Sequence, residues 1–162
     1  MKIRVFPDTV LREKAKEARD TGAAAALSAA LLSVMRQSRG CVGIAATQLG
    51  ILSRIICVDV TGHKKAKESH GLLVMTNPVI TDGSGEITVR EGCLSVPDFT
   101  GNVTRNAAIK MSYMDMDGAK RQLETSGFEA VVIQHELDHL DGILFIDRIT
   151  DVKRNLFKRI NY

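Results

Sequence analysis

Two histidines four residues apart mark the part of the chain best suited to metal chemistry. Within residues 125–142, TSGFEAVVIQHELDHLDG, His135 and His139 fall on one face of a predicted helix, one turn apart. A single metal ion can join two imidazoles placed in this way, and Glu136 is well placed to take a proton from a water molecule on that ion. The alternative is that both histidines are core residues bonded to backbone carbonyls, with Glu136 in solvent. The pattern favours a metal-dependent hydrolase.

A catalytic site of this kind needs a third protein ligand. The extended pattern H-E-x-x-H-x-x-G-x-x-H has a histidine where this chain has Phe145, and no glutamate follows Glu136. These absences disfavour a small HExxH metallopeptidase and direct the search upstream. Cys93 is the best candidate because it follows a predicted strand beside a glycine and polar residues, although spacing alone leaves Cys41 open. A thiolate with two imidazoles suits iron(II), zinc, cobalt or nickel.

Length and composition indicate an ordinary globular protein. The 162 residues are enough for one domain with its own core, so we expect a single domain over residues 1–162. An odd number of cysteines, three, argues against a disulfide framework. No apolar run is long enough to span a bilayer and the start does not resemble a signal peptide, so we expect a cytoplasmic protein, or an organellar one in a eukaryotic source.

Hydrophobic periodicity predicts three main helices. One runs from about residue 23 to 37 with Asp20 or Thr21 as its cap, and the HExxH helix starts with a capping box formed by Ser126 and Glu129. A short C-terminal helix is predicted from an apolar stripe with a basic opposite face, formed by Ile149, Val152, Leu156 and Ile160.

The remaining apolar segments predict strands separated by turns. They lie at residues 3–5, 55–60, 72–76, 86–90, 108–114 and 121–124. Cys57, in the middle of a continuous apolar run, is predicted to fill the core. Residues 61–71, which contain His63 and His70, are predicted to form a solvated loop that is too flexible to fix a metal ligand.

Three stretches, in this order along the chain, resemble the peptide deformylases. The family pattern G-x-G-h-A-A-x-Q is similar to residues 41–48, E-G-C-L-S matches residues 91–95, and Q-H-E-x-D-H-L-x-G matches residues 134–142. The resemblance covers nearly the whole chain. It implies an α+β fold in which antiparallel strands pack around a central HExxH helix, with N- and C-terminal helices. It also implies removal of the N-formyl group from N-formylmethionine at the start of nascent polypeptides during protein biosynthesis.

The resemblance assigns roles to the residues of these motifs. Cys93, His135 and His139 are the implied metal ligands, with Fe²⁺ expected and Zn²⁺, Ni²⁺ or Co²⁺ as alternatives. Glu136 is the implied general base and acid in an attack of metal-bound water on the formyl carbonyl.

Further residues are implied to stabilise charge and to bind substrate. Gln48, through its side-chain amide, and Leu94, through its backbone N–H, are the implied oxyanion stabilisers, and losing Gln48 is expected to affect kcat more than KM. Arg105 is implied to support Glu91. The residues near the motifs that are expected to bind the formyl-methionine are Val42, Gly43, Ile44, Val89, Gly92, Phe128, Val131 and Val132.

One motif position departs from the family, since Cys41 stands where the first glycine is expected. A side chain there could narrow the cleft, unless Gly40 supplies the conformational freedom. The departure leaves open a second class of function, a deformylase-like protein with weak catalysis that mainly binds.

The distribution of charge bears on the partners. Residues 147–162 hold five basic residues against two acidic ones, which accounts for the whole net charge of +3. The resemblance implies that such a basic C-terminal helix docks on the ribosome, and the concentrated charge favours ribosomal RNA as the partner. We expect no membrane partner and no specific DNA partner.

Overall fold

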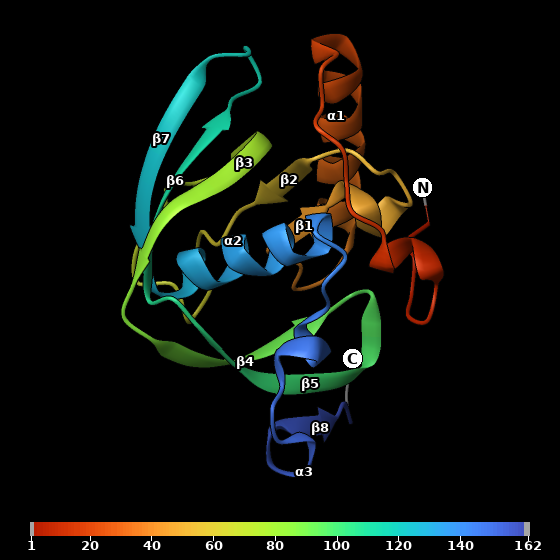
Figure 1. The fold of residues 1–162 in the computed structure, drawn as a ribbon, viewed down its shortest axis with the longest axis vertical. Coiled ribbons are helices and arrows are strands. Elements are labelled where there is room, and N and C mark those ends of the chain that lie inside the picture. Colours follow the sequence, from red (N-terminus) through yellow and green to blue (C-terminus); the bar gives the residue numbers. More distant parts are fainter. Residues whose placement is uncertain (1, 161–162) are drawn as a thin grey trace.

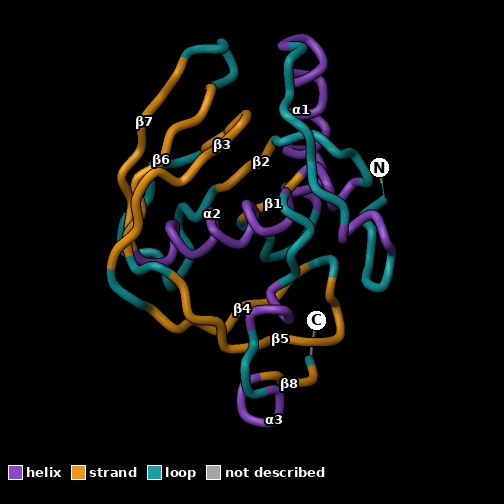
Figure 2. The backbone as a smooth tube through the Cα atoms, in the orientation of Figure 1, coloured by secondary structure: helices purple, strands orange, loops and turns teal. Residues whose placement is uncertain are grey.

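The computed structural model describes residues 2–160, and its centre is a buried helix with an antiparallel sheet on either side (Figure 1). Helix α2 (Gly127–Leu140) runs between the two groups of strands, which Figure 2 separates by colour from the loops. The first sheet has the order β1-β2-β3-β6-β7, with bounds Gly43–Ala45, Ile55–Val58, Leu73–Ser84, Ala108–Met114 and Lys120–Ser126. The second has the order β4-β5-β8, with bounds Ile87–Cys93, Val96–Arg105 and Leu156–Lys158. The predicted α+β class, with strands packed around the HExxH helix, is confirmed.

Helix α2 is buried on all sides. Every residue from Glu129 to Leu140 is buried, because one face packs on the first sheet through side chains such as Ile133 and the other carries the polar motif. The predicted capping box is wrong, since the Ser126 side chain makes no capping hydrogen bond. The Glu129 carboxylate instead accepts hydrogen bonds from Thr125 Oγ1 at 2.7 Å and from the backbone N–H of His70 at 2.8 Å. Glu129 therefore anchors the loop after β2 to the helix.

Helix α1 (Thr21–Gln37) covers the end of the first sheet. Asp20 is its N-cap, and a side-chain oxygen of Asp20 accepts a hydrogen bond from the backbone N–H of Ala23 at 3.0 Å, as predicted. Leu31 of this helix packs with Cys57 of β2 in a buried apolar cluster. The prediction that Cys57 is a core residue is confirmed.

The two ends of the chain differ from the predictions. The predicted C-terminal helix is only the single turn α3 (Val152–Asn155), after which β8 pairs with the edge of β5. A four-residue helix is marginal by itself, and pairing with β5 supplies backbone hydrogen bonds that a longer helix would have made internally. The predicted strand at residues 3–5 is absent, and Arg4 N instead donates to Gln48 O at 2.7 Å.

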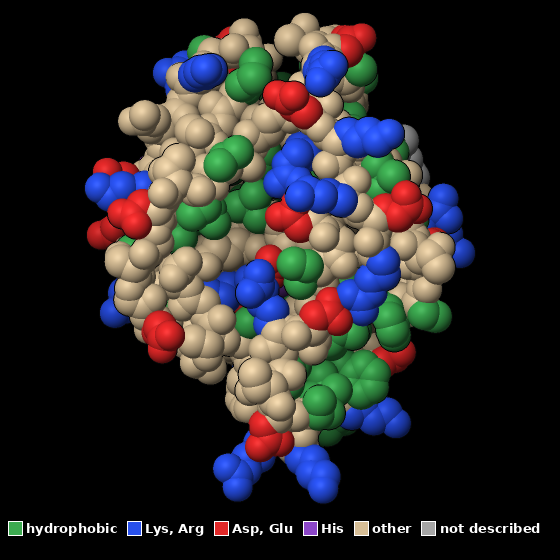
Figure 3. Space-filling model, viewed as in Figure 1, with side chains coloured by type: hydrophobic (Ala, Val, Ile, Leu, Met, Phe, Trp, Pro, Cys, Tyr) green, Lys and Arg blue, Asp and Glu red, His purple; other side chains and the backbone are tan. Residues whose placement is uncertain are grey.

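Three short 3₁₀ segments complete the described chain: Thr9–Arg12, Ala46–Leu49 and Phe145–Arg148. Among residues 2–160, no helix combines the length and the apolar character that a membrane crossing requires. The face drawn in Figure 3 carries Lys and Arg side chains interspersed with Asp and Glu. Charges of both signs therefore alternate on that face, with no continuous basic surface.

Candidate active site

Three potential metal ligands come together where the end of β4 meets α2. One ligand atom each from Cys93, His135 and His139 lie within 4.8 Å of one another, and all three residues are buried. Cys93 Sγ and His139 Nε2 are 3.2 Å apart. The set fits one ion with bonds of about 2.0–2.3 Å to sulfur and nitrogen, and a thiolate with two imidazoles suits a borderline divalent metal. His63 and His70, the other two histidines, are not part of this group.

The electrostatics of Cys93 favour the thiolate, which is the form that binds metals. Burial opposes ionisation, but the charge of His139 and hydrogen bonds from His135 and His139 bring the pKa of Cys93 well below its ordinary value. The backbone N–H of Ser95 also points to Cys93 Sγ, at 3.4 Å. The thiol is thus surrounded by donors, as a metal-binding thiolate requires.

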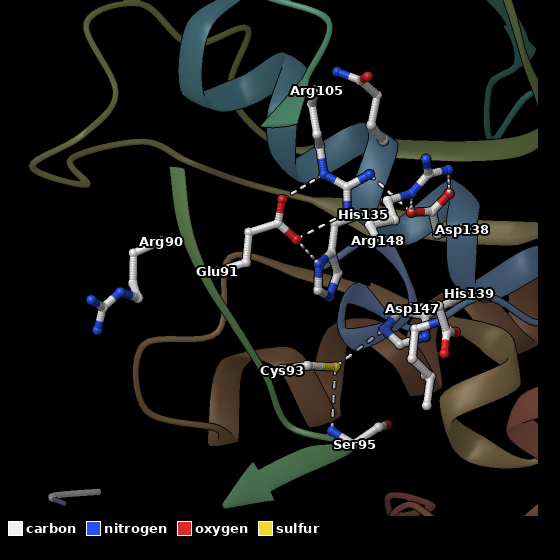
Figure 4. A network of polar contacts seen from close by, with 12 residues as sticks. Arg90, Glu91, Cys93, Ser95, Arg105, His135, Asp138, His139, Asp147 and Arg148 are labelled. Atoms are coloured by element: carbon white, nitrogen blue, oxygen red, sulfur yellow. Dashed lines mark hydrogen bonds and ion pairs between the residues drawn. The ribbon is translucent and has the colours of Figure 1, made fainter. Parts of the chain in front are cut away.

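A buried ionic network orients His135 (Figure 4). Glu91 Oε2 lies 2.7 Å from His135 Nδ1, which leaves the other ring nitrogen for a metal. Arg105 makes two hydrogen bonds to the Glu91 carboxylate, of 2.5 and 2.9 Å, and a third to Asp138 at 2.9 Å. Arg148 Nε and Nη2 also bond to Asp138, at 2.5 and 2.6 Å. Although burial opposes it, the hydrogen bonds from Arg105 and His135 lower the pKa of Glu91 to about 2.

Glu136 points into the same site with one oxygen unpaired. The residue is 4% exposed, and its Oε2 is buried with no hydrogen-bond partner among the described residues. A Cβ added to Gly43 would lie only 2.6 Å from Glu136 Oε1, so the absence of a side chain at Gly43 makes room for the carboxylate. Burial raises the pKa of Glu136 to about 7, even though His135 and His139 act in the opposite direction. A buried carboxylate near pKa 7 with a free oxygen can accept or donate a proton at neutral pH.

The Gln48 side chain is held with its NH₂ group towards Cys93. Its Oε1 accepts a hydrogen bond from the backbone N–H of Ala45 at 2.9 Å, which fixes the orientation of the amide. Gln48 Nε2 donates to Ser95 Oγ at 3.1 Å and lies 3.5 Å from Cys93 Sγ. Leu94 lines the same cavity. Both residues predicted to stabilise an oxyanion therefore lie beside the metal-ligand group.

A cavity of about 250 Å³ opens next to these groups. Most of the residues predicted to bind substrate line it, namely Val42, Gly43, Gly92, Phe128, Val131 and Val132. The structure does not bring the other two to its wall. Ile44 is fully buried between α1 and β2, because alternate residues of β1 face opposite sides, and Val89 lies further along β4.

The loop of residues 61–71 contributes more to the cavity than the sequence suggested. His63 stacks on Phe128 with ring centroids 4.5 Å apart, and Lys65 Nζ donates to the carbonyl oxygen of Arg90 at 3.0 Å. His63 and Lys65 both line the cavity. A polar segment without periodicity gives no signal for such contacts, since they depend on how the loop folds back over α2.

Cys41 occupies the motif position without backbone strain. Asn77 is the one non-glycine residue between 2 and 160 with a positive φ, so Cys41 has an ordinary backbone conformation. Gly40, just before it, has a φ of 72° and takes the left-handed conformation. Cys41 Sγ lies 3.1 Å from the carbonyl oxygen of Gly43, and burial raises the pKa of its thiol to about 12. The thiol is therefore a half-buried neutral group in the cavity wall.

Comparison with known proteins gives consistent matches over nearly the whole chain. A family model described as polypeptide deformylase matches residues 1–155. A peptide deformylase of Thermodesulfovibrio yellowstonii is 39% identical over 160 residues, which are 98% of this chain and 94% of that protein. A probable peptide deformylase from Synechococcus phage S-SSM7 is 39% identical with a TM-score of 0.80, and the match covers 91% of this chain and 99% of that one. The structure of a peptide deformylase from Acinetobacter baumannii with Met-Ala-Ser bound is 33% identical with a TM-score of 0.85, covering 92% of this chain and 98% of that one.

Proposed function

The chain belongs to the peptide deformylase family, metal-dependent hydrolases that remove the N-formyl group from nascent polypeptides, and from that premise we propose how its residues carry out the reaction. The observation that supports the proposal most strongly is the buried group of Cys93, His135 and His139 with the unpaired carboxylate oxygen of Glu136 beside it.

Cys93, His135 and His139 hold the divalent ion, for which Fe²⁺ is the expected metal. When bound, the ion acts as a Lewis acid that lowers the pKa of a water molecule towards about 7. Glu91 keeps His135 in the orientation needed for binding through its hydrogen bond to Nδ1, and Arg105 keeps Glu91 ionised. The ligand set thus depends on a second layer of charged residues.

Glu136 moves the protons of the reaction. Its free Oε2 accepts a proton as water adds to the formyl carbon, and the same carboxyl then gives that proton to the nitrogen of the leaving amine. The bond between the formyl carbon and this nitrogen breaks, and formate and a free N-terminus result. A pKa of about 7 suits both halves of this cycle.

Gln48 and Leu94 stabilise the negative charge that develops on the formyl oxygen. The NH₂ group of Gln48 is directed towards the site because Ala45 holds the opposite end of the amide. The backbone N–H of Leu94 supplies the second donor. A donor that is already oriented loses little free energy in reorganisation when the charge forms.

The methionine side chain enters the apolar part of the cavity formed by Phe128, Val131 and Val132. The rest of the peptide lies in extended form between β1 and β4. Among residues 2–160, each of these strands pairs on one side only, β1 with β2 and β4 with β5, so each has an unpaired edge. Gly43 of β1 and residues 90–93 of β4 line the cavity. The relative with Met-Ala-Ser bound supports a peptide that begins with methionine.

The basic C-terminal segment is a second point of contact in this proposal. Lys153 and Arg154 on α3 and Lys158 on β8 are exposed and could meet ribosomal RNA near the nascent chain. Such an enzyme works where formylated chains are made, in the cytoplasm or in an organelle. The test is salt-dependent ribosome binding by the wild type and by a variant with all three residues changed to glutamine, and equal binding by both would contradict this role.

The reaction is tested by formate release from N-formyl-Met-Ala-Ser, with N-acetyl-Met-Ala-Ser as control, using anaerobically purified protein with measured metal content. We expect rapid release of formate from the first peptide and no hydrolysis of the second. A metal-loaded protein that releases no formate would support a binding protein, and cleavage of internal peptide bonds would support a metallopeptidase.

A further inference from the structure

The mouth of the catalytic cavity is surrounded by basic side chains. Arg39, Lys65, Arg90 and Arg159 line it, and its two carboxylates, Glu91 and Glu136, are both buried in the interior. Among residues 2–160, no carboxylate lies within 4.0 Å of the charged atoms of Arg39, Lys65 or Arg90. Arg39, Lys65 and Arg90 therefore place positive charge at the rim that no ion pair among the described residues neutralises.

The C-terminal strand holds Arg90 in place. The Arg90 guanidinium lies 3.5 Å from the ring centroid of Phe157 on β8, and its Nε donates to Asn102 Oδ1 at 3.2 Å. Figure 4 shows Arg90 directed away from the Glu91 network, as expected for neighbours on a strand. A guanidinium stacked on an aromatic ring is oriented before any ligand arrives, which reduces the entropy lost on binding.

Two further cations, Lys65 and Arg159, contact β4 and line the cavity. Lys65 Nζ lies 3.0 Å from the carbonyl oxygen of Arg90 and 5.6 Å from the ring centroid of Phe128. Arg159 lies against Gly92, since a Cβ added to Gly92 would be 2.2 Å from Arg159 Nη2. The absence of a side chain at Gly92 thus leaves room for the guanidinium of Arg159, which lines the cavity.

These positions correspond to particular residues of a bound peptide. Arg90 precedes Cys93 by three residues, which is about 10 Å along a strand at 3.3 Å per residue. If the formyl group lies beside Cys93 and the peptide runs along β4, the methionine lies near Gly92 and the next two residues lie near Arg90 and Lys65. We propose that Lys65, Arg90 and Arg159 form a subsite for acidic side chains at the second and third residues of the formylated chain.

The subsite rests on the proposed placement of the peptide and adds a preference to it. Carboxylate side chains would meet three cations in a partly enclosed cleft, where screening by water is weaker than on an open surface. We expect the effect mainly on KM, because these residues lie away from the bond that breaks.

The test compares amidated peptides that differ only in charge. With formyl-Met-Asp-Glu-Ala-amide and formyl-Met-Asn-Gln-Ala-amide, kcat/KM should favour the acidic peptide about fivefold at low salt, and the ratio should shrink at 0.5 M salt. Moving the acidic pair to the fifth and sixth residues of a longer peptide should remove the preference. A formylated tripeptide with a free C-terminal carboxylate and no acidic side chains is tested separately, because its only negative charge is the terminal carboxylate.

Substitutions at the rim test whether its cations cause the preference for acidic peptides. In Lys65→Gln and Arg90→Gln the ratio should fall below about twofold, whereas Arg90→Lys should keep most of it because the charge remains. Lys120→Gln, which removes an exposed cation of β7 outside the cavity, is the matched control and should leave the ratio unchanged. Equal kcat/KM for the acidic and amide peptides, or a preference limited to the free-acid tripeptide, would overturn the subsite. Hydrolysis of the neutral peptide would still support the proposed reaction.

Discussion

At the scale of single residues, Gly43 is the position where the smallest change should have the largest effect. A Cβ there would lie 2.6 Å from Glu136 Oε1 and 2.8 Å from Val132 Cγ1. Gly43→Ala should therefore displace the Glu136 carboxylate and lower kcat about 100-fold, the lower end of the effect of losing a general base. Gly22→Ala is the matched control, since a Cβ at Gly22 would make only an ordinary contact of 3.4 Å with Asp20 Oδ1 and the residue lies in the first turn of α1. Wild-type kcat for Gly43→Ala, with the fold intact by circular dichroism, would contradict this reading.

Gln48 tests the oxyanion assignment. Gln48→Ala removes the NH₂ group that lies 3.5 Å from Cys93 Sγ. We expect kcat to fall about 10²–10³-fold while KM changes little, because the charge exists only in the transition state. Steady-state kinetics on formyl-Met-Ala-Ser give both constants. A rise in KM with kcat unchanged would instead indicate that Gln48 binds the ground state.

Cys41 should be replaceable by the glycine that the family motif has at this position. Its backbone conformation is ordinary and Gly40 provides the positive φ, so neither residue type is required for the turn. Cys41→Gly should keep kcat/KM within a few-fold and lower the free energy of unfolding by about 1 kcal/mol through greater freedom of the unfolded chain. A tenfold gain in activity would show that the thiol obstructs the cleft.

At the scale of elements, the ionic network joins β4, β5 and α2, and its stability should depend on pH in a defined direction. Hydrogen bonds from Arg105 and His135 lower the pKa of Glu91 from an ordinary value of 4.5 to about 2, against the effect of burial. The stabilisation is fully present above pH 4.5 and is lost as the pH falls towards 2. Its size is on the order of 3 kcal/mol.

Comparison of metal-free wild type with metal-free Glu91→Gln isolates this effect, because neither protein then has a metal ion that it could lose in acid. Urea unfolding at pH 7, 4.5 and 3 should show a less stable variant at the first two pH values and a smaller difference at pH 3. A difference that stays constant over this range would mean that Glu91 is not ionised in the folded protein.

Sequence patterns predicted an element correctly where residues within one segment determine its structure. The periodic segment of α2, the Asp20 cap and the buried run at Cys57 are of this kind. The capping box was wrong because Glu129 has better partners in Thr125 and in His70, which is far away in the chain. The predicted C-terminal helix, with its apolar stripe from Ile149 to Ile160, was wrong beyond Asn155 because the edge of β5 gives residues 156–158 a set of backbone partners that replaces further helical turns.

The same distinction applies to the site. Motif spacing together with the family resemblance predicted a site of Cys93, His135, His139 and Glu136, and the structure brings the three predicted ligands together beside Glu136. The cavity wall was harder to predict. Ile44 faces the core, while Lys65 reaches the cavity from a polar loop that residue patterns do not position.

At the scale of the whole molecule, the chain places one buried helix between two sheets so that its polar motif meets the end of β4 (Figure 1). The first sheet supplies a rigid apolar base, and the second supplies Cys93 and the edge along which we place the peptide. The C-terminal strand then contributes Phe157 next to Arg90, so the C-terminal part of the chain also shapes the mouth of the cavity.

The most direct test of the account is the activity and metal content of Glu136→Gln measured on one preparation. The substitution keeps the size of the side chain and one acceptor oxygen, but it replaces the other oxygen with an NH₂ group and removes the ability to take a proton. We predict that the variant holds the same amount of metal per chain as the wild type, while formate release from formyl-Met-Ala-Ser falls about 10³-fold. Formate release near the wild-type rate with metal retained would contradict the central claim that Glu136 is the general base and acid.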